Sequence, residues 1–239
     1  MANIINIETS AGSCTVALGI EGEVVELWED ATGSNHSRKL APYVEQALDV
    51  LARRELPLDA VAVSLGPGSY TGLRIGLSLA KGLCFSRSIP LIGIPTLELL
   101  AVKAMFVNME FSGEELLVPM IDARRMEVYT AAYDFKLQEI MKPRPMILGS
   151  SSFSDLAERH QLVFIGDGSG KARDMLDISE KSIWLSTAAP SADTMAIMSE
   201  KSFREKRFLD LAYSVPIYLK EYEAKHSTNK VLDQIRTQK

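Results

Sequence analysis

The residues with the clearest chemical potential lie between Ser64 and Leu83. We predict a buried strand, a tight glycine turn and a helix capped by Ser69 and Thr71 from the run Ser64-Leu-Gly-Pro-Gly-Ser-Tyr-Thr-Gly-Leu-Arg-Ile-Gly-Leu-Ser-Leu-Ala-Lys-Gly-Leu83. A glycine turn that opens a helix leaves backbone N–H groups free to bind an anion such as a phosphate. A Gly-x-Gly pair alone is weak evidence for phosphate, so anion binding is one of several uses open to this turn.

The predicted helix carries small residues at every fourth position: Gly72, Gly76 and Ala80. Each interior glycine costs about 1 kcal/mol relative to alanine, which indicates that another backbone approaches this stripe closely. The approaching group is a partner, a ligand or the chain's own sheet, and the sequence leaves these alternatives open. A membrane helix is excluded, because Arg74 and Lys81 interrupt a run that is also too short to span a bilayer.

Two carboxylates, Glu8 and Asp122, each end a predicted strand, where they could hold a metal–nucleotide complex. Such groups more often accept hydrogen bonds from the backbone of the next turn. The sequence contains no Gly-x-x-x-x-Gly-Lys-Ser loop and no His-Glu-x-x-His motif, and its three histidines are far apart. A P-loop ATPase is therefore excluded, and no Gly-x-Ser-x-Gly elbow supports a serine hydrolase.

Composition places the chain among ordinary globular proteins. It has 239 residues, of which 46% are hydrophobic and 24% charged, so it can bury one large core or two medium ones. A net charge of −5 argues against a surface that holds nucleic acid by itself, although a local basic patch remains open. Two cysteines make no disulfide framework, and residues 1–8 are typical of a strand rather than a signal peptide. We expect a cytoplasmic protein without a membrane segment.

The elements that position these residues form two similar halves. Strands are predicted at residues 3–8, 13–20 and 23–28, helices at 37–53 and 71–86, and the same order of parts returns later in the chain. Gly66, Gly68 and Ser69 correspond to residues 100 positions later, which are Gly166, Gly168 and Ser169. We therefore expect two related α/β units, residues 1–109 and 110–239, with the last segment able to fold back on the first unit.

Motifs spread over nearly the whole chain resemble the TsaB (YeaZ) family. The block from Gly66 to Leu83 is the most specific of them when it is taken in full. The others are Ile5-Asn-Ile-Glu-Thr-Ser10, Ser13-Cys-Thr-Val-Ala-Leu18, His36 with Leu40-Ala-Pro42, Ile92-Gly-Ile-Pro-Thr-Leu97, Ile121-Asp-Ala-Arg124 with Glu127-Val-Tyr129, Gly166-Asp-Gly168 and Pro216-Ile-Tyr-Leu-Lys220.

This resemblance implies the actin-like fold of the sugar kinase and Hsp70 class, built from two ribonuclease-H-like units. It also implies a role in making threonylcarbamoyladenosine on tRNAs that read codons starting with A. In that system the paralogue TsaD carries the metal and the transfer chemistry, the ATPase TsaE joins the complex, and a separate enzyme supplies threonylcarbamoyl-adenylate. The chain would be the non-catalytic scaffold, meeting tRNA through the complex.

The resemblance also sets expectations for cofactors. The catalytic paralogue binds its metal with two histidines four positions apart, whereas His36 is followed by Leu40 here, so we expect no metal. The stretch after Asp122 reads Ala123-Arg-Arg-Met126 where nucleotide-binding relatives carry glycine, so we expect ATP or ADP to bind weakly or not at all. The residues of this vestigial nucleotide site are Glu8, Thr9, Ser10, Asp122, Gly166 and Gly168.

The first two helices, Ser37–Arg53 and Thr71–Phe85, are implied to pair with the same helices of a second molecule, in a homodimer or with TsaD. We expect the small stripe to let these helices approach, so a bulky residue at position 76 would disrupt the complex. The expected interface residues are Leu40, Tyr43, Val44, Ala47, Leu51, Gly72, Leu73, Gly76, Leu79 and Ala80.

Two other functions stay open from the sequence. An independent actin-like ATPase or phosphotransferase would use Glu8, Thr9, Asp122 and the glycines near 166–170. A peptidase is the weaker alternative, suggested only by the older glycoprotease label of the catalytic branch of the family.

Overall fold

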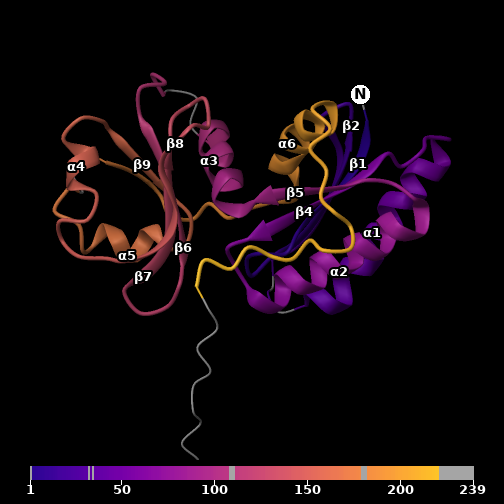
Figure 1. Ribbon diagram of the computed structural model, residues 1–239, viewed down its shortest axis with the longest axis horizontal. Helices are drawn as coiled ribbons and strands as arrows, with labels where there is room; N and C mark the ends of the chain where they lie inside the picture. The colour runs from indigo at the N-terminus through magenta and orange to yellow at the C-terminus, as the bar shows by residue number, and fades with distance from the viewer. Residues whose placement is uncertain (1, 32, 34, 108–110, 179–181, 221–239) are drawn as a thin grey trace, which may run out of the picture.

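The computed structural model describes residues 2–220 apart from 32, 34, 108–110 and 179–181. Two five-stranded sheets with helices packed on them make up the molecule (Figure 1). The first part of the chain contains β1 (Asn3–Glu8), β2 (Cys14–Ile20), β3 (Glu23–Asp30), α1 (His36–Arg53), β4 (Ala60–Gly66), α2 (Tyr70–Arg87) and β5 (Leu91–Pro95). The rest contains α3 (Thr96–Val107), β6 (Leu116–Asp122), β7 (Glu127–Tyr133), β8 (Glu139–Ile147), α4 (Ser154–Ala157), β9 (Leu162–Ile165), α5 (Ser169–Arg173), β10 (Ile183–Leu185) and α6 (Ala192–Arg204).

The two sheets share one topology. The first has the order β3-β2-β1-β4-β5, with β1 antiparallel to β2 and parallel to β4. The second has the order β8-β7-β6-β9-β10, with β6 antiparallel to β7 and parallel to β9. Gly66 ends β4 and Gly166 directly follows the equivalent strand β9, with φ of +104° and +105°. The predicted repeat is thus confirmed: two ribonuclease-H-like units form an actin-like fold.

Helices cover both faces of the first sheet. The apolar faces of α1 and α2 pack on one face, and α6 packs on the other. Figure 1 shows α6 on one side of β4 and β5 and the pair α1 and α2 on the other. Because the central strands are covered on both faces, every residue of β1 and β4 is buried.

α3 lies between the two sheets and belongs to both cores. Leu99 and Val102 pack with the first sheet, whereas Leu97, Leu100 and Ala104 pack with the second. A helix that is apolar on all sides is a buried helix, and α3 has apolar neighbours on both sides for this reason. The Nζ of Lys103 also lies 3.4 Å from the Oδ1 of Asp193 at the start of α6. The two units are therefore joined through α3.

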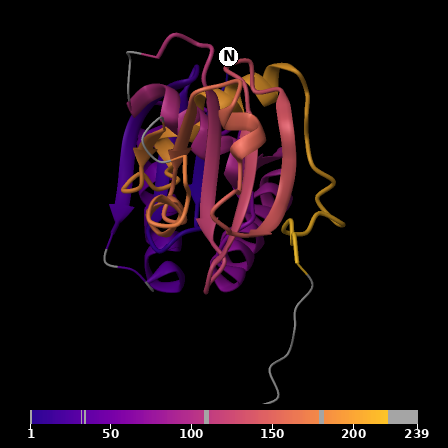
Figure 2. The ribbon, with the colours of Figure 1, turned by 90° about the vertical axis from the view of Figure 1, so that its left-hand side faces the viewer.

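The end of the chain returns to the first unit. α6 lies within residues 110–239 of the sequence and packs on β1 and β2 of the first sheet. The extended segment after α6, residues 205–220, is called the strap. It runs along the outside of the molecule in Figure 2, and its Leu209 N–H donates to Leu91 O at 2.8 Å.

β8 is longer than the sequence suggested. Pro143 and Pro145 are predicted to end the sheet, yet β8 continues through both of them to Ile147. β8 is the edge strand of the second sheet, where proline removes no ladder hydrogen bond on the solvent side. In the described part of the chain, no helix is both long and apolar enough to cross a membrane.

Candidate functional site

The turn between β1 and β2 carries three residues of the predicted nucleotide site: Glu8, Thr9 and Ser10, all buried. β1 brings them beside the end of β4, with which it pairs. The Oγ of Ser64 accepts a hydrogen bond from the Thr9 N–H at 3.3 Å. The Ser69 N–H donates to the carbonyl oxygen of Ser10 at 2.7 Å. The turn is therefore held by β4 and by the start of α2.

Three glycines press on this turn. A Cβ on Gly68 would overlap the carbonyl oxygen of Ser10, and a Cβ on Gly72 would overlap that of Thr9. A Cβ on Gly76 would overlap the Oγ1 of Thr9. The backbone that approaches the small stripe of α2 is therefore the chain's own turn, the blandest of the three alternatives that the sequence left open.

Two N–H groups in the first turn of α2 have acceptors within this chain. The Gly72 N–H donates to Ser69 Oγ at 3.2 Å, and the Leu73 N–H donates to Ser69 O at 2.9 Å. The N–H of Ser69 itself is bonded to Ser10, as described above. An anion at this helix start would compete with these bonds.

Glu8 is a fully buried carboxyl group. Its Oε1 accepts a hydrogen bond from the Ser10 N–H, and its Oε2 has no hydrogen-bond partner among the described residues. Burial raises the pKa of Glu8 above its usual value, and the hydrogen bonds of Ser10 and Ser64 offset this only in part. A raised pKa weakens a carboxyl group as a ligand for the Mg²⁺ of a nucleotide, because the ligand must give up its proton.

The equivalent turn of the second unit, between β6 and β7, is closed by Lys171 of α5. Its Nζ donates to Asp122 Oδ1 at 2.9 Å, to Arg125 O at 2.8 Å and to Glu127 O at 2.7 Å. Burial raises the pKa of Asp122, but the hydrogen bonds from Lys171 and from the Arg124 N–H outweigh it, and the pKa lies below its usual value. Asp122 is thus an ionised group that this chain's own lysine neutralises.

Gly166 and Gly168 pack on the end of β6 as the first unit's glycines pack on the end of β1. A Cβ on Gly166 would overlap the carbonyl oxygen of Met120, and one on Gly168 would lie 3.0 Å from the carbonyl carbon of Ile121. The Gly168 N–H donates to Met120 O at 3.1 Å. The predicted nucleotide residues therefore form two separate turns, each packed within its own unit.

Two cavities of the molecule lie elsewhere. One, of about 420 Å³, lies between the β2–β3 turn and α6, and the other, of about 480 Å³, lies beside Glu115 and His160. Neither is lined by a residue of the two turns. These cavities give no support to a nucleotide site at Glu8 or Asp122.

His36, the first residue of α1, braces the β1–β2 turn. Its Nε2 lies 3.1 Å from Ala11 O and 3.2 Å from Ser13 O. Carbonyl oxygens only accept hydrogen bonds, so this nitrogen carries the proton and is turned away from metal binding. Leu40, one turn later, is 1% exposed and lies in the core. Among the described residues, no group of three His, Cys, Asp or Glu side chains could hold a metal ion.

Most residues of the expected partner interface are buried in this chain's own core. Of its ten residues, Tyr43 and Leu79 are half-buried, and the other eight are buried within this chain. The spacing of apolar residues along a helix identifies the face that packs on the chain's own sheet. The residues chosen by this spacing are therefore core residues. The residues that cannot face a partner directly are Leu40, Val44, Ala47, Leu51, Gly72, Leu73, Gly76 and Ala80.

The outward face of α2 carries different small residues, which the sequence analysis missed. Ser78 and Gly82 are exposed, and a Cβ on Gly82 would meet nothing within 4 Å. Ile75, Leu79 and Leu83 lie half-buried on the same helix. The sequence offered one signal for this outward face, which is Gly82. It is an interior helical glycine outside the series 72, 76 and 80, and nothing in the described chain packs on it.

The helical glycines predict opposite responses to alanine. Gly72→Ala should lower the free energy of unfolding by about 1–3 kcal/mol, because the new Cβ displaces the β1–β2 turn. Gly82→Ala should raise it by about 1 kcal/mol, because open space leaves only the gain in helix propensity. Urea unfolding followed by circular dichroism measures both changes. Equal effects at the two positions would contradict the packing described here.

The buried carboxyl of Glu8 predicts a pH-dependent stability. Its pKa is higher in the folded protein than in the unfolded chain, so ionisation opposes folding as the pH rises above the unfolded value. Glu8→Gln should therefore stabilise the protein at pH 8, with the difference shrinking toward pH 4. Asp122→Asn should behave oppositely: its pKa is lowered in the folded state, so the variant loses stability at pH 8 and the loss shrinks in acid. Thermal unfolding across this pH range tests both, and a Gln variant less stable at pH 8 would refute the assignment for Glu8.

Comparisons with known proteins agree in sequence and in fold. Residues 30–227 match the family model described as "TsaD: tRNA N6-adenosine threonylcarbamoyltransferase". The chain is 32% identical over 228 residues to the tRNA threonylcarbamoyladenosine biosynthesis protein TsaB of Bacillus subtilis, covering 92% of this chain and 95% of that protein. It is 35% identical over 130 residues to the protein of the same name from Escherichia coli, 54% of either chain.

Solved structures show the same fold. The structure described as "YeaZ from Pseudomonas aeruginosa" superposes with a TM-score of 0.71 at 24% identity, covering 92% of this chain and 100% of that one. A second structure from that organism, described as similar to peptidase YEAZ, has a TM-score of 0.76 at 24% identity and the same coverage. The chain therefore belongs to the family that the matching model describes and, within it, to the TsaB (YeaZ) proteins.

Proposed function

We propose that this chain is a non-catalytic subunit of the machinery that attaches a threonylcarbamoyl group to adenosine in tRNAs reading codons that start with A. Membership of the TsaB proteins, whose relatives are named for threonylcarbamoyladenosine biosynthesis, supports the pathway. The observation that carries the non-catalytic role is the packing of α2 on the β1–β2 turn. A phosphate at this turn would have to compete with these contacts.

The proposal includes the absence of a metal and of a tightly held nucleotide. His36 directs its protonated Nε2 to two carbonyl oxygens, and Leu40 is part of the core. Glu8 is buried with a raised pKa, and Asp122 is neutralised by Lys171. ATP and ADP then bind weakly or not at all, because neither carboxyl group is free to hold the Mg²⁺ of a nucleotide.

We propose that the outward face of α1 and α2 binds a TsaD-type partner, or a second copy of this chain when that partner is absent. Half-buried apolar side chains follow the line between the two helices: Tyr43 on α1, and Ile75, Leu79 and Leu83 on α2. Gly82 leaves room for a partner helix beside them. An ATPase of the TsaE type then joins the assembled pair, and tRNA meets this chain through the complex.

The alternative functions have less support. An independent ATPase or phosphotransferase would need an ionised carboxylate at Glu8 and room above the β1–β2 turn, whereas burial and α2 oppose both. A peptidase would need a nucleophile beside a base; His36 is instead bonded to backbone carbonyls. One similar structure is described as resembling a peptidase, but its identity of 24% carries the fold alone.

The partner face predicts the effect of a larger side chain at Gly82. Gly82→Leu should weaken association with a TsaD-type protein from the same organism by about tenfold or more, equivalent to about 1.4 kcal/mol. The reason is that a leucine side chain fills the open space over α2 without touching this chain's own core. Size-exclusion chromatography with light scattering gives the stoichiometry, and titration calorimetry gives the affinity.

Gly149→Leu is the matched control. It places the same side chain at another glycine with open space, in the second unit after β8, and should leave association unchanged. Unaltered binding by a folded Gly82→Leu variant would show that this face is not the interface. If the wild-type chain does not bind the TsaD-type protein, the scaffold proposal itself is wrong.

A further inference from the structure

An aromatic and cationic cluster lies where the strap crosses the start of α2. The rings of Tyr70 and Tyr218 lie 5.4 Å apart between centroids. The guanidinium of Arg74 lies 4.0 Å from the centre of the Tyr70 ring, and its Nε donates to the Tyr218 hydroxyl at 3.0 Å. Tyr70 and Tyr218 remain 44% and 42% exposed. Three planar groups are thus held together at the surface.

The strap connects this cluster with a pair of arginines on the second unit. Two residues after Tyr218, the Nζ of Lys220 lies 3.2 Å from the Oε2 of Glu127, the first residue of β7. Arg124 and Arg125 precede Glu127 on the β6–β7 turn and are exposed. Two extended residues span at most about 7 Å. The ion pair between Lys220 and Glu127 therefore holds the turn with the two arginines close to the two tyrosines. Figure 1 shows the yellow end of the strap passing from α2 to the end of β6.

The arginines are not explained by the turn that carries them. Arg124 and Arg125 have φ of +69° and +50°. Glycine and asparagine adopt this left-handed conformation most readily, and a longer side chain there adds a backbone cost. Backbone geometry alone would therefore favour other residues at these two positions. A ligand for the two guanidinium groups would explain why arginines stand there.

The local charge favours an anion. No carboxylate among the described residues forms an ion pair with Arg124 or Arg125. The nearby acids already have partners: Asp122 is bonded to Lys171, and Glu127 to Lys220. Asp167 accepts the Asp122 N–H at 2.9 Å through its Oδ1. Both arginines on this turn are exposed, and Asp122, which interacts electrostatically with Arg124, is already paired with Lys171.

We propose that this surface contacts RNA directly, with Arg124 and Arg125 on phosphates and with Tyr70, Arg74 and Tyr218 as a platform on which an unpaired base stacks. Guanidinium forks suit phosphate oxygens, and aromatic rings beside an arginine suit an exposed base. The inference rests on the proposed function, because it assigns part of tRNA binding to this subunit. It sharpens that function, in which tRNA was expected to meet this chain only through the complex.

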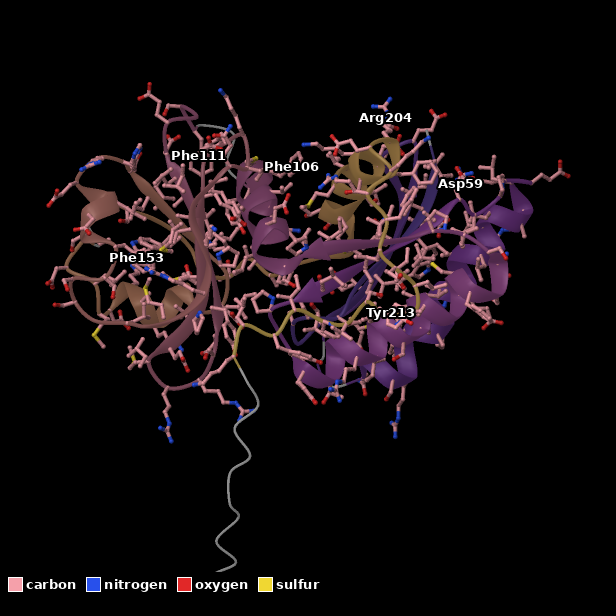
Figure 3. The ribbon with its side chains drawn as sticks, viewed as in Figure 1. Asp59, Phe106, Phe111, Phe153, Arg204 and Tyr213 are labelled. Atoms are coloured by element: carbon pink, nitrogen blue, oxygen red, sulfur yellow. The ribbon has the colours of Figure 1, made fainter. Side chains whose placement is uncertain are left out.

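The turn permits a variant that removes charge without harming the backbone. Arg124→Asn combined with Arg125→Gly deletes both guanidinium groups and supplies the two residues that best accept a positive φ. Arg204→Gln with Arg207→Gln is the matched control, because it removes two positive charges at the other end of the strap (Arg204 is labelled in Figure 3). Each protein is assembled with its TsaD-type partner and titrated with an unmodified tRNA transcript at several salt concentrations.

The expected result is specific to the Asn–Gly variant. Its affinity for tRNA should fall about tenfold or more at 0.1 M salt, and the slope of log K against log [salt] should shrink by about 1.5 to 2, as for two lost phosphate contacts. The control should keep the wild-type slope. Wild-type affinity and slope in a folded Asn–Gly variant would overturn the proposal.

Tyr70→Ala tests the stacking platform. Alanine is compatible with the first turn of the helix. The affinity for tRNA should fall about fivefold or more, because one stacked base is lost. The salt slope should not change, because no phosphate contact is lost. Tyr213→Ala, which removes an 84% exposed tyrosine from the same strap (Figure 3), should have no effect. Loss of the protein complex in place of tRNA affinity would show that this surface binds the partner, and the RNA proposal would be wrong. If the wild-type proteins form no complex at all, the proposed function has failed independently of this inference.

Discussion

The contact between α2 and the β1–β2 turn determines how the rest of the first unit is used. Gly68, Gly72 and Gly76 let the helix lie directly on Thr9 and Ser10. A close backbone contact of this kind fixes the direction of α2, and with it the outward face that α2 shares with α1. The proposed partner face therefore depends on this contact, because the contact decides which side of α2 points away from the sheet.

α3 extends this rigidity to the second unit. Its apolar residues belong to both cores, and Lys103 ties it to α6. The strap adds a second connection: Lys81 of α2 donates to the carbonyls of Ala212 and Ser214, each at 3.1 Å, and Lys220 pairs with Glu127.

Much of this fold was predictable from local patterns. Apolar periodicity located α1 and α2, and the 100-residue spacing from Gly66 to Gly166 revealed a repeat that the two sheet orders confirm. Pro143 and Pro145 wrongly indicated the end of a strand, because an edge strand such as β8 tolerates proline. Edge position is a property of the whole sheet and cannot be read from a local pattern. The return of α6 to the first unit depends on contacts between distant segments, which periodicity cannot show.

The candidate site was harder to predict, for a physical reason. Small residues at 72, 76 and 80 show that something approaches the helix but not which backbone it is, so own-chain packing and partner packing look alike in sequence. Gly82 was the informative residue, because nothing in this chain touches its open side. The Tyr70–Arg74–Tyr218 cluster joins residues more than 140 positions apart and depends on the path of the strap.

The central claim is that the packing of α2 on the β1–β2 turn leaves no nucleotide site there. Titration calorimetry of the isolated chain with Mg²⁺–ATP tests that claim most directly. The packing of α2 predicts no saturable heat at any concentration up to the millimolar range. Saturable binding in the micromolar range, lost on substitution of Thr9 or Asp122, would contradict it. That result would mean that α2 leaves the β1–β2 turn in solution and that the chain retains a nucleotide site.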